Sequence, residues 1–452
     1  MINYDLKVGF SRIEINPPLG VNVTGYFLKR YADGILDDTE INTVAIGKGG
    51  KTVILITLDC MEVTTDFCTS AREAVAKATG VDKDAVFIHA LHPHTGMTFA
   101  MEAEMEFESE KEYISLVRRK IADSAVYAIK DMNPARMGVA VGKAERIGFN
   151  RRYLMKDGSV QTNPGVNNPD IVKSIGLLDE RVNVIRFERE CGDNVVLGNY
   201  GNHPDVIGGC SISADWPGFT RRIFERAVDD AKCVFFNGAQ GDINHVNVAP
   251  KGGDLNGMFN DFDDVTRGYA HSRHMGNVVA AAIMSVYEKV EFIPADSLDF
   301  VQKDIMIASN MPKPEDMEQA RYIDKLHNEG RDAELPYKGM MLTTVVAEAG
   351  RMLRLEHGPE YFPLHLSAIK IGDVAFIGIP GEPFTGIGLG LKDAEDWKMV
   401  CPTCITNGYS GYFPMKDSYD EGGYEARSSI YKAGVAETII EEGKKILNGL
   451  RK

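Results

Sequence analysis

Three histidines gather in the segment AVFIHALHPHTG, a short apolar run that leads into a loop rich in glycine and proline. His89, His92 and His94 fall within six residues of one another. Pro93 biases the residue before it toward extended backbone, and side chains two apart on an extended chain point the same way. We therefore expect His92 and His94 to face one site. An HxH pair at a strand end is typical of a metal site, although two surface-loop histidines would give the same pattern.

Three further runs carry metal-ligand or proton-transfer side chains. VVLGNYGNHPD delivers His203, although a lone histidine is more often structural. AFIGIPGEPFTG places Glu382 after an apolar strand, where a carboxylate binds a metal, acts as a base or caps the following helix. A Gly-rich run holds phenols that pack in a core or serve as oxygen ligands and oxyanion donors. They are Tyr409, Tyr412, Tyr419 and Tyr424.

Two more polar loops belong with these runs. VFFNGAQGDINHVN places Asp242, Asn244 and His245 directly after a predicted strand. GFNRRYLMKDG offers Arg151 and Arg152, and an arginine can clamp a carboxylate or stabilise a developing oxyanion. On spacing alone, both loops also fit ordinary polar surface turns.

The elements that must position these side chains alternate along the chain. Apolar runs predict strands at 41–47, 52–59, 85–90, 137–142, 195–200, 233–238 and, as a pair, within 366–380. Helical periodicity is found at 65–79, 109–132, 216–230, 268–288 and 429–449, and the region 300–360 is predicted to be mostly helical. This alternation indicates an α/β protein with a mixed sheet flanked by helices. Because no break separates domains, we expect one domain over residues 1–452.

Composition limits the classes of partner. The formal net charge of −15 argues against nucleic acid, because phosphate binding needs clustered lysine and arginine. No segment approaches the ~18 apolar residues of a membrane span. The seven cysteines are odd in number and several lie in apolar runs, which fits reduced thiols. Cys401 and Cys404 have CxxC spacing, but they stand at the end of an apolar run without a second such pair, so we interpret them as packing residues. The N-terminus has no secretory pattern, and we expect a cytoplasmic protein.

Taken together, the motifs resemble the catalytic domain of the neutral/alkaline ceramidase family, in order and over nearly the whole chain. The family's opening pattern is similar to VGFSRIEINPPLGV, its HTHSG to HPHTG (92–96) and its NRSP-type segment to NRR (150–152). Its SSDNKG resembles SADWPG (213–218), its GDVSPN resembles GDINHV (241–246), and PGE is found at 380–382. Its tyrosine run is similar to NGYSGY, DSY and GYEA near the C-terminus.

The resemblance implies a ceramidase-type zinc hydrolase fold without the family's C-terminal β-sandwich. It also implies a bound Zn2+ ion, and zinc with an open coordination position lowers the pKa of a bound water to about 7. The implied metal ligands are His92, His203, Glu382 and Tyr412. The implied catalytic groups around the scissile amide are His94 as proton donor, with Arg151 and Tyr424 as oxyanion donors.

One departure from the family pattern bears on mechanism. The family's GDVSPN serine, which has been assigned a catalytic role, is replaced here by Asn244. An asparagine cannot accept an acyl group, so we expect attack by metal-activated water, with Asn244 still able to hydrogen-bond a substrate. The absence of a secretory signal and of the β-sandwich leads us to expect a substrate smaller or more polar than ceramide.

The leading hypothesis is therefore a zinc-dependent amidohydrolase acting on a small-molecule or N-acyl substrate. An esterase, lactonase or deacetylase with the same metal site remains open, because water activated by a metal attacks amides and esters alike. A non-catalytic metal- or sugar-binding protein on the same scaffold is the alternative from another class. The sequence leaves the oligomeric state open, a homo-oligomer included.

Overall fold

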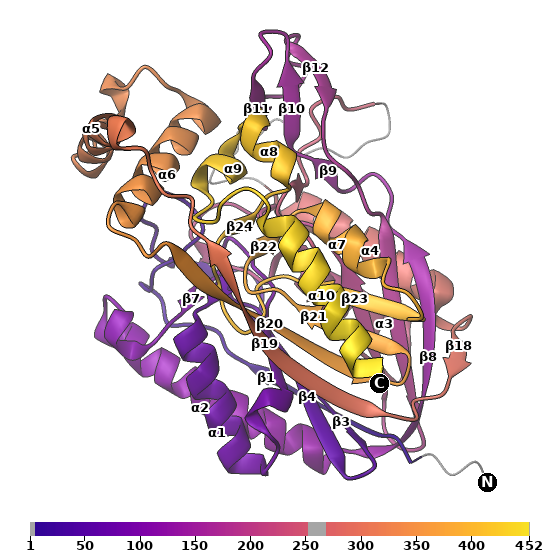
Figure 1. Cartoon of the computed structure of the whole chain (residues 1–452). Helices are drawn as coiled ribbons and strands as arrows, with labels where there is room; N and C mark the ends of the chain where they lie inside the picture. The colour runs from indigo at the N-terminus through magenta and orange to yellow at the C-terminus, as the bar shows by residue number, and fades with distance from the viewer. Residues whose placement is uncertain (1–4, 252–267, 452) are drawn as a thin grey trace.

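The strands form two main β-sheets in the computed structural model, which describes residues 5–251 and 268–451 (Figure 1). The larger sheet has the order β16-β14-β13-β8-β1-β3-β4-β6, with β18 beside β8. Its strands are β1 (Lys7–Glu14), β3 (Glu40–Lys48), β4 (Lys51–Leu58), β6 (Val86–Ala90), β8 (Asn133–Lys143), β13 (Arg181–Arg189), β14 (Asn194–Tyr200), β16 (Ala231–Asn237) and β18 (Glu291–Ile293). The smaller sheet consists of β19 (Leu298–Ala308), β20 (Tyr361–Ile371), β21 (Val374–Gly378) and β23 (Met399–Thr403).

The two sheets pack face to face, and strand β4 shows why. Side chains alternate between the faces of a strand. Ile54, Ile56 and Leu58 point into one apolar core, whereas Val53 and Leu55 point into another. The second core also contains residues of β20, β21 and β23, so it fills the space between the sheets. A strand buried on both faces reads as a continuous apolar run, as TVILITL does here.

Helices cover both outer faces and complete four layers. Helices α1 (Thr65–Thr79) and α2 (Glu108–Lys130) cover one half of the larger sheet, and α3 (Asp215–Ala227) and α4 (Tyr269–Tyr287) cover the other half. Helices α7 (Thr385–Lys392) and α10 (Val435–Arg451) cover the smaller sheet, and α10 crosses it in Figure 1. The predicted α/β class with a mixed sheet flanked by helices is confirmed, and the face-to-face second sheet is an addition to it.

Short elements surround one edge of this body. They are β2 (Gly34–Ile35), β5 (Glu62–Val63), β7 (Thr98–Phe99), β9 (Phe149–Asn150), β10 (Arg152–Met155), β11 (Val160–Thr162), β12 (Ile171–Ser174), β15 (Ser211–Ile212), β17 (Ile243–Asn244), β22 (Glu382–Pro383), β24 (Tyr412–Phe413), α8 (Lys416–Glu421) and α9 (Tyr424–Ser428). Several of them carry the motifs identified from the sequence.

The strand ends of both sheets meet at this edge. Three neighbouring pairs run parallel, namely β4–β6, β14–β16 and β21–β23. Ligand sites in α/β proteins gather at the carboxyl ends of such strands. Backbone hydrogen bonds join the two sheets there: Cys404 N–H donates to Asn237 O over 3.1 Å, and Asn407 N–H donates to Ile88 O over 2.8 Å. Loops that follow strands of different sheets are therefore held against one another.

Two predicted elements differ from the structure. The region 300–360 begins with strand β19 rather than helix, because β19 pairs with β20 along its whole length, from Leu298 opposite Ile371 to Ala308 opposite Tyr361. Helices α5 (Met317–Asn328) and α6 (Gly339–Leu355) follow and pack on each other in a separate small core (Figure 1). The last helix begins at Val435, six residues after the predicted start at 429. No helix within residues 5–251 and 268–451 is long and apolar enough to span a bilayer.

Candidate functional site

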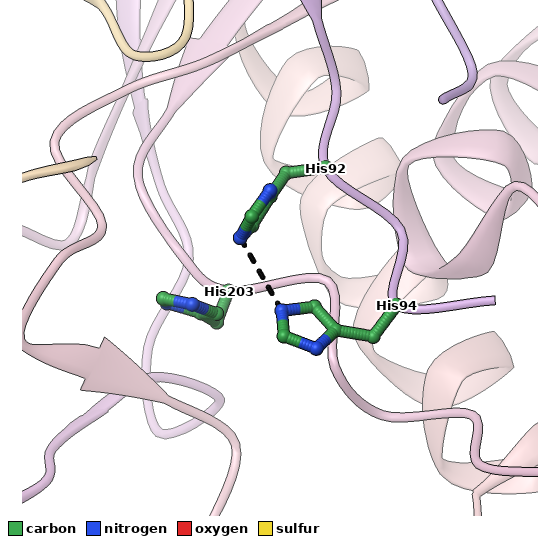
Figure 2. Close-up of side chains that lie close together, drawn as sticks. All are labelled: His92, His94 and His203. Atoms are coloured by element: carbon green, nitrogen blue, oxygen red, sulfur yellow. Dashed lines mark hydrogen bonds between the residues drawn. The ribbon is translucent and has the colours of Figure 1, made fainter. Parts of the chain in front are cut away.

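His92 and His94 lie in the loop that follows β6, and their rings meet despite an unexpected backbone. His92 has a φ of 74°, so the prediction of extended backbone there is wrong. A left-handed non-glycine residue is held only where its surroundings fix it. Here His92 N–H donates to Cys60 O and His94 N–H donates to Pro204 O, each over 3.0 Å. The Nε2 atoms of the two histidines lie 3.3 Å apart (Figure 2).

Backbone carbonyls orient two of the imidazoles. The Nδ1 of His92 lies 2.7 Å from the carbonyl oxygen of Met61, and the Nδ1 of His203 lies 3.0 Å from that of Gln240. Because a carbonyl oxygen only accepts, each Nδ1 carries the proton and each Nε2 is left with a lone pair. This arrangement is the usual support for metal-binding histidines. His203 lies opposite His92 and His94 in the close-up (Figure 2).

Glu382 places its carboxylate beside the Nε2 atoms of His92 and His203. Its Oε2 lies 3.1 Å from Nε2 of His203 and 3.5 Å from Nε2 of His92, and all three residues are buried. Neither Oε2 of Glu382 nor Nε2 of His203 makes a hydrogen bond. Burial favours the neutral acid, but His92 and His203 outweigh it and hold the pKa of Glu382 well below its usual value. Burial likewise opposes a charge on His92, yet the carboxylate raises the pKa of that imidazole.

The facing nitrogen and oxygen atoms of this cluster are arranged as ligands of a metal ion rather than as hydrogen-bond partners of one another. One ring nitrogen from each of His92, His94 and His203 lies within 4.8 Å of the other two. Buried polar atoms in folded proteins almost always have partners, whereas two of the facing atoms here have none. Imidazole nitrogen and carboxylate oxygen are the donors that zinc prefers. The buried cluster could therefore hold a metal ion of the zinc type.

Strand pairing brings the tyrosine run to the carboxylate. Strands β22 and β24 run parallel, with Glu382 directly opposite Tyr412. Burial raises the pKa of the Tyr412 phenol well above its usual value, and Glu382 raises it further. The sequence placed Tyr409 only among four candidate phenols, but in the structure its hydroxyl donates to Oε1 of Glu382 over 2.8 Å. No sequence signal separates Tyr409 from its neighbours, because only the fold of the loop decides which phenol reaches Glu382.

Arg151 is fixed beside the tyrosines. Its Nε donates to Oε1 of Glu425 over 2.6 Å, and its Nη2 donates to the carbonyl oxygen of Gly241 over 2.8 Å. The guanidinium carbon lies 5.4 Å from the centre of the Tyr412 ring. The ring of Tyr424 lies 5.5 Å from the same ring. A buried cation and two phenols therefore stand side by side next to the carboxylate.

A cavity of about 510 Å³ opens onto this cluster. Residues 24–30 and helix α6 supply part of its wall. Six of the residues predicted from the sequence line it: His94, Arg151, His203, Glu382, Tyr412 and Tyr424. His92 does not line the cavity but contacts its lining residues His94 and Glu382.

Asn244 is placed differently. It lies on β17, where its Nδ2 donates to Asn163 Oδ1 over 3.1 Å and its Oδ1 accepts from Val246 N–H over 3.0 Å. Asn244 is not among the described residues that line the cavity. The neighbouring Asp242 accepts from the N–H and the hydroxyl of Thr385 and from Asn150 Nδ2. These contacts give Asn244 and Asp242 structural partners.

A glycine next to the site gives a mutational test. A Cβ on Gly241 would lie 2.5 Å from the carbonyl oxygen of Glu382. We expect Gly241→Ala to push the Glu382 backbone away, to cost about 1–3 kcal/mol of stability and to weaken metal binding about tenfold. Gly350→Ala is the control, because a Cβ at that helical position would meet no atom within 4 Å beyond its own helix, and the change should stabilise by about 0.5–1 kcal/mol. Equal metal affinity in both variants would contradict the expectation.

Comparisons with known proteins show what this chain is similar to. Two solved structures match over 99% of the chain with a TM-score of 0.72. One is the neutral ceramidase from Pseudomonas aeruginosa, at 16% sequence identity and covering 75% of that chain. The other is a ceramidase complexed with C2, at 15% identity and covering 76% of that chain. No family model and no curated protein matches the sequence. The molecule thus has a ceramidase-like fold and carries a buried three-histidine cluster.

Proposed function

We propose that this protein is a metal-dependent hydrolase that cleaves the amide bond of an N-acyl substrate. The observation that carries the proposal is the facing pair formed by Nε2 of His203 and Oε2 of Glu382. These buried atoms lie 3.1 Å apart and make no hydrogen bond, at the wall of a cavity that Arg151 also lines. The ceramidase-like fold supports the same reaction class.

The ion would be held by His92, His203, Glu382 and Tyr412. Both histidines present Nε2 because their Nδ1 atoms are engaged by carbonyl oxygens. When bound, a zinc-type cation supplies Lewis acidity and lowers the pKa of a coordinated water to about 7. Glu382 stands between the two imidazoles, so its charge offsets that of the cation.

The remaining residues act on the substrate. Arg151 and Tyr424 line the cavity beside Tyr412 and stabilise the negative charge that develops on the carbonyl oxygen. His94 takes a proton from the attacking water and passes it to the departing amine. Burial and the two neighbouring histidines lower the pKa of His94 well below its usual value, so its imidazole starts neutral and can accept that proton. Both ends of the Asn244 amide are engaged, which supports water rather than a side chain as the nucleophile.

Metal removal tests the proposal directly. The purified chain should contain a single bound metal ion and should hydrolyse simple N-acyl amides, since His92, His203 and Glu382 converge on one point. Dialysis against a chelator should abolish turnover, and stoichiometric Zn2+ should restore it. Elemental analysis measures the ion, and amine release measures turnover. Hydrolysis that survives complete metal removal would overturn the proposal. A tightly bound ion without turnover of any amide or ester would favour a non-catalytic metal-binding protein.

A further inference from the structure

The cavity beside the histidine cluster adjoins a second one of about 490 Å³. Both are lined by residues 24–30, Glu62 and Thr98. Glu62 lies on the short strand β5, which follows β4 and pairs in parallel with β7 so that Glu62 stands opposite Thr98. A carboxylate therefore occupies the junction of two cavities, on the wall of the proposed reaction chamber.

Glu62 is anchored by a hydrogen bond, and burial raises its pKa to about 7, a rise that His92 and Thr98 only partly oppose. The Thr98 hydroxyl donates to Oε1 of Glu62 over 3.1 Å. Among residues 5–251 and 268–451, no lysine or arginine forms an ion pair with Glu62. The lysine and arginines of the cavity wall have other partners. Lys29 pairs with Glu106, Arg151 pairs with Glu425, and Arg30 donates to the carbonyl oxygens of Gly209, Thr24 and His94. A cationic ligand would stabilise the charged form of this carboxylate, because partial burial makes a charge without a full counter-ion costly.

The rest of the cavity indicates where the uncharged part of a ligand would lie. Helix α6 contributes Met340, Leu342 and Val346 to the wall of the first cavity, and residues 24–30 contribute Phe27 and Leu28. These side chains offer apolar contact but no charge. The net charge of −15 also draws cations rather than anions toward the protein.

From this geometry we infer that Glu62 is a specificity-determining residue that binds an ammonium group of the substrate. The substrate class is then an amide that also carries a primary ammonium group, separated from the scissile bond by a short aliphatic chain. This inference rests on the proposed hydrolase function for the position of the scissile bond. The contact itself is a charge-assisted hydrogen bond between the ammonium and Glu62, with apolar contacts along the chain.

Three probes of matched length test the contact. N-(4-aminobutyl)acetamide carries an ammonium group, N-pentylacetamide is neutral and 5-acetamidopentanoate is anionic. We expect kcat/KM for the ammonium probe to exceed that for the neutral probe by about tenfold to a hundredfold, with the anionic probe the poorest. In Glu62→Gln the ammonium and neutral probes should become nearly equal. Glu108→Gln is the matched control: it removes the same charge from an exposed residue outside both cavities and should keep the preference.

A second variant separates recognition from structural support. Glu62→Asp keeps the charge but withdraws it by one methylene, so the preferred ammonium probe should lengthen by one methylene across a series of chain lengths. Binding of the same probes by calorimetry gives a readout without turnover. If no amide is hydrolysed but the ammonium probe still binds through Glu62, the hydrolase proposal fails and this inference stands. Equal use of all three probes would overturn the inference, as would a Glu62→Gln variant that loses metal while keeping its preference.

Discussion

Glu382→Gln is expected to lower metal affinity by about a hundredfold or more and to abolish hydrolysis. The carboxylate is buried between His92 and His203, and its Oε2 has no hydrogen bond of its own. Glutamine keeps the volume but removes the charge that offsets a bound cation. Its amide nitrogen would also aim hydrogens at a point where only lone pairs converge. Metal titration monitored by competition with a chromophoric chelator measures the affinity, and amine release measures the rate.

Two companion variants define what the result means. Glu291→Gln removes an exposed carboxylate that pairs with Lys398, and it should leave both metal affinity and rate unchanged. His94→Ala should retain most of the metal affinity while losing turnover, because the proposed ligands are His92, His203, Glu382 and Tyr412. Loss of metal in His94→Ala, together with retention in Glu382→Gln, would instead assign the ion to the three histidines alone.

Much of the fold and of the site is local enough to be predicted from sequence. The strand ending at Ala90 and the strand ending at Tyr200 are short apolar runs, and each is followed within a few residues by a histidine. Parallel strands place their carboxyl ends at one edge, so a prediction of strand-end loops is also a prediction of proximity. The family resemblance, which rests on the order of the motifs, added Glu382 and Tyr412 to the predicted site. The opposed pairing of these two residues in β22 and β24 is consistent with it.

What the sequence could not predict depends on long-range pairing. Strand β19 has a mixed polar and apolar pattern that suits an amphipathic helix, and only the neighbouring β20 makes it a strand. The left-handed backbone of His92 is likewise set by bonds from the loop to Cys60 and Pro204. Glu62 carried no motif, since a single glutamate after an apolar run is common. Its place between two cavities appears only in the folded chain, since both cavities are lined by residues distant in sequence.

The second large effect concerns the buried pair of Arg151 and Glu425, whose Nε and Oε1 atoms lie 2.6 Å apart with both residues almost fully buried. Glu425→Ala should destabilise the fold by about 3–5 kcal/mol, because it leaves a buried guanidinium without its counter-ion. Turnover should also fall, since Glu425 and the carbonyl oxygen of Gly241 hold Arg151 in place. Denaturant unfolding measures the stability, and steady-state kinetics measure the turnover.

The double variant Arg151→Met with Glu425→Leu separates stability from catalysis. Removing both charges replaces an ion pair by apolar volume, which is often close to neutral for stability, so the double variant should unfold less readily than Glu425→Ala. Its kcat should nevertheless fall by about a hundredfold to a thousandfold, because one of the two proposed donors for the developing oxyanion is gone. The losses of unfolding free energy caused by Arg151→Met alone and by Glu425→Leu alone should therefore not sum to the loss in the double variant. If they add, or if kcat recovers together with stability, Arg151 is a structural residue and the oxyanion role belongs to Tyr424 alone.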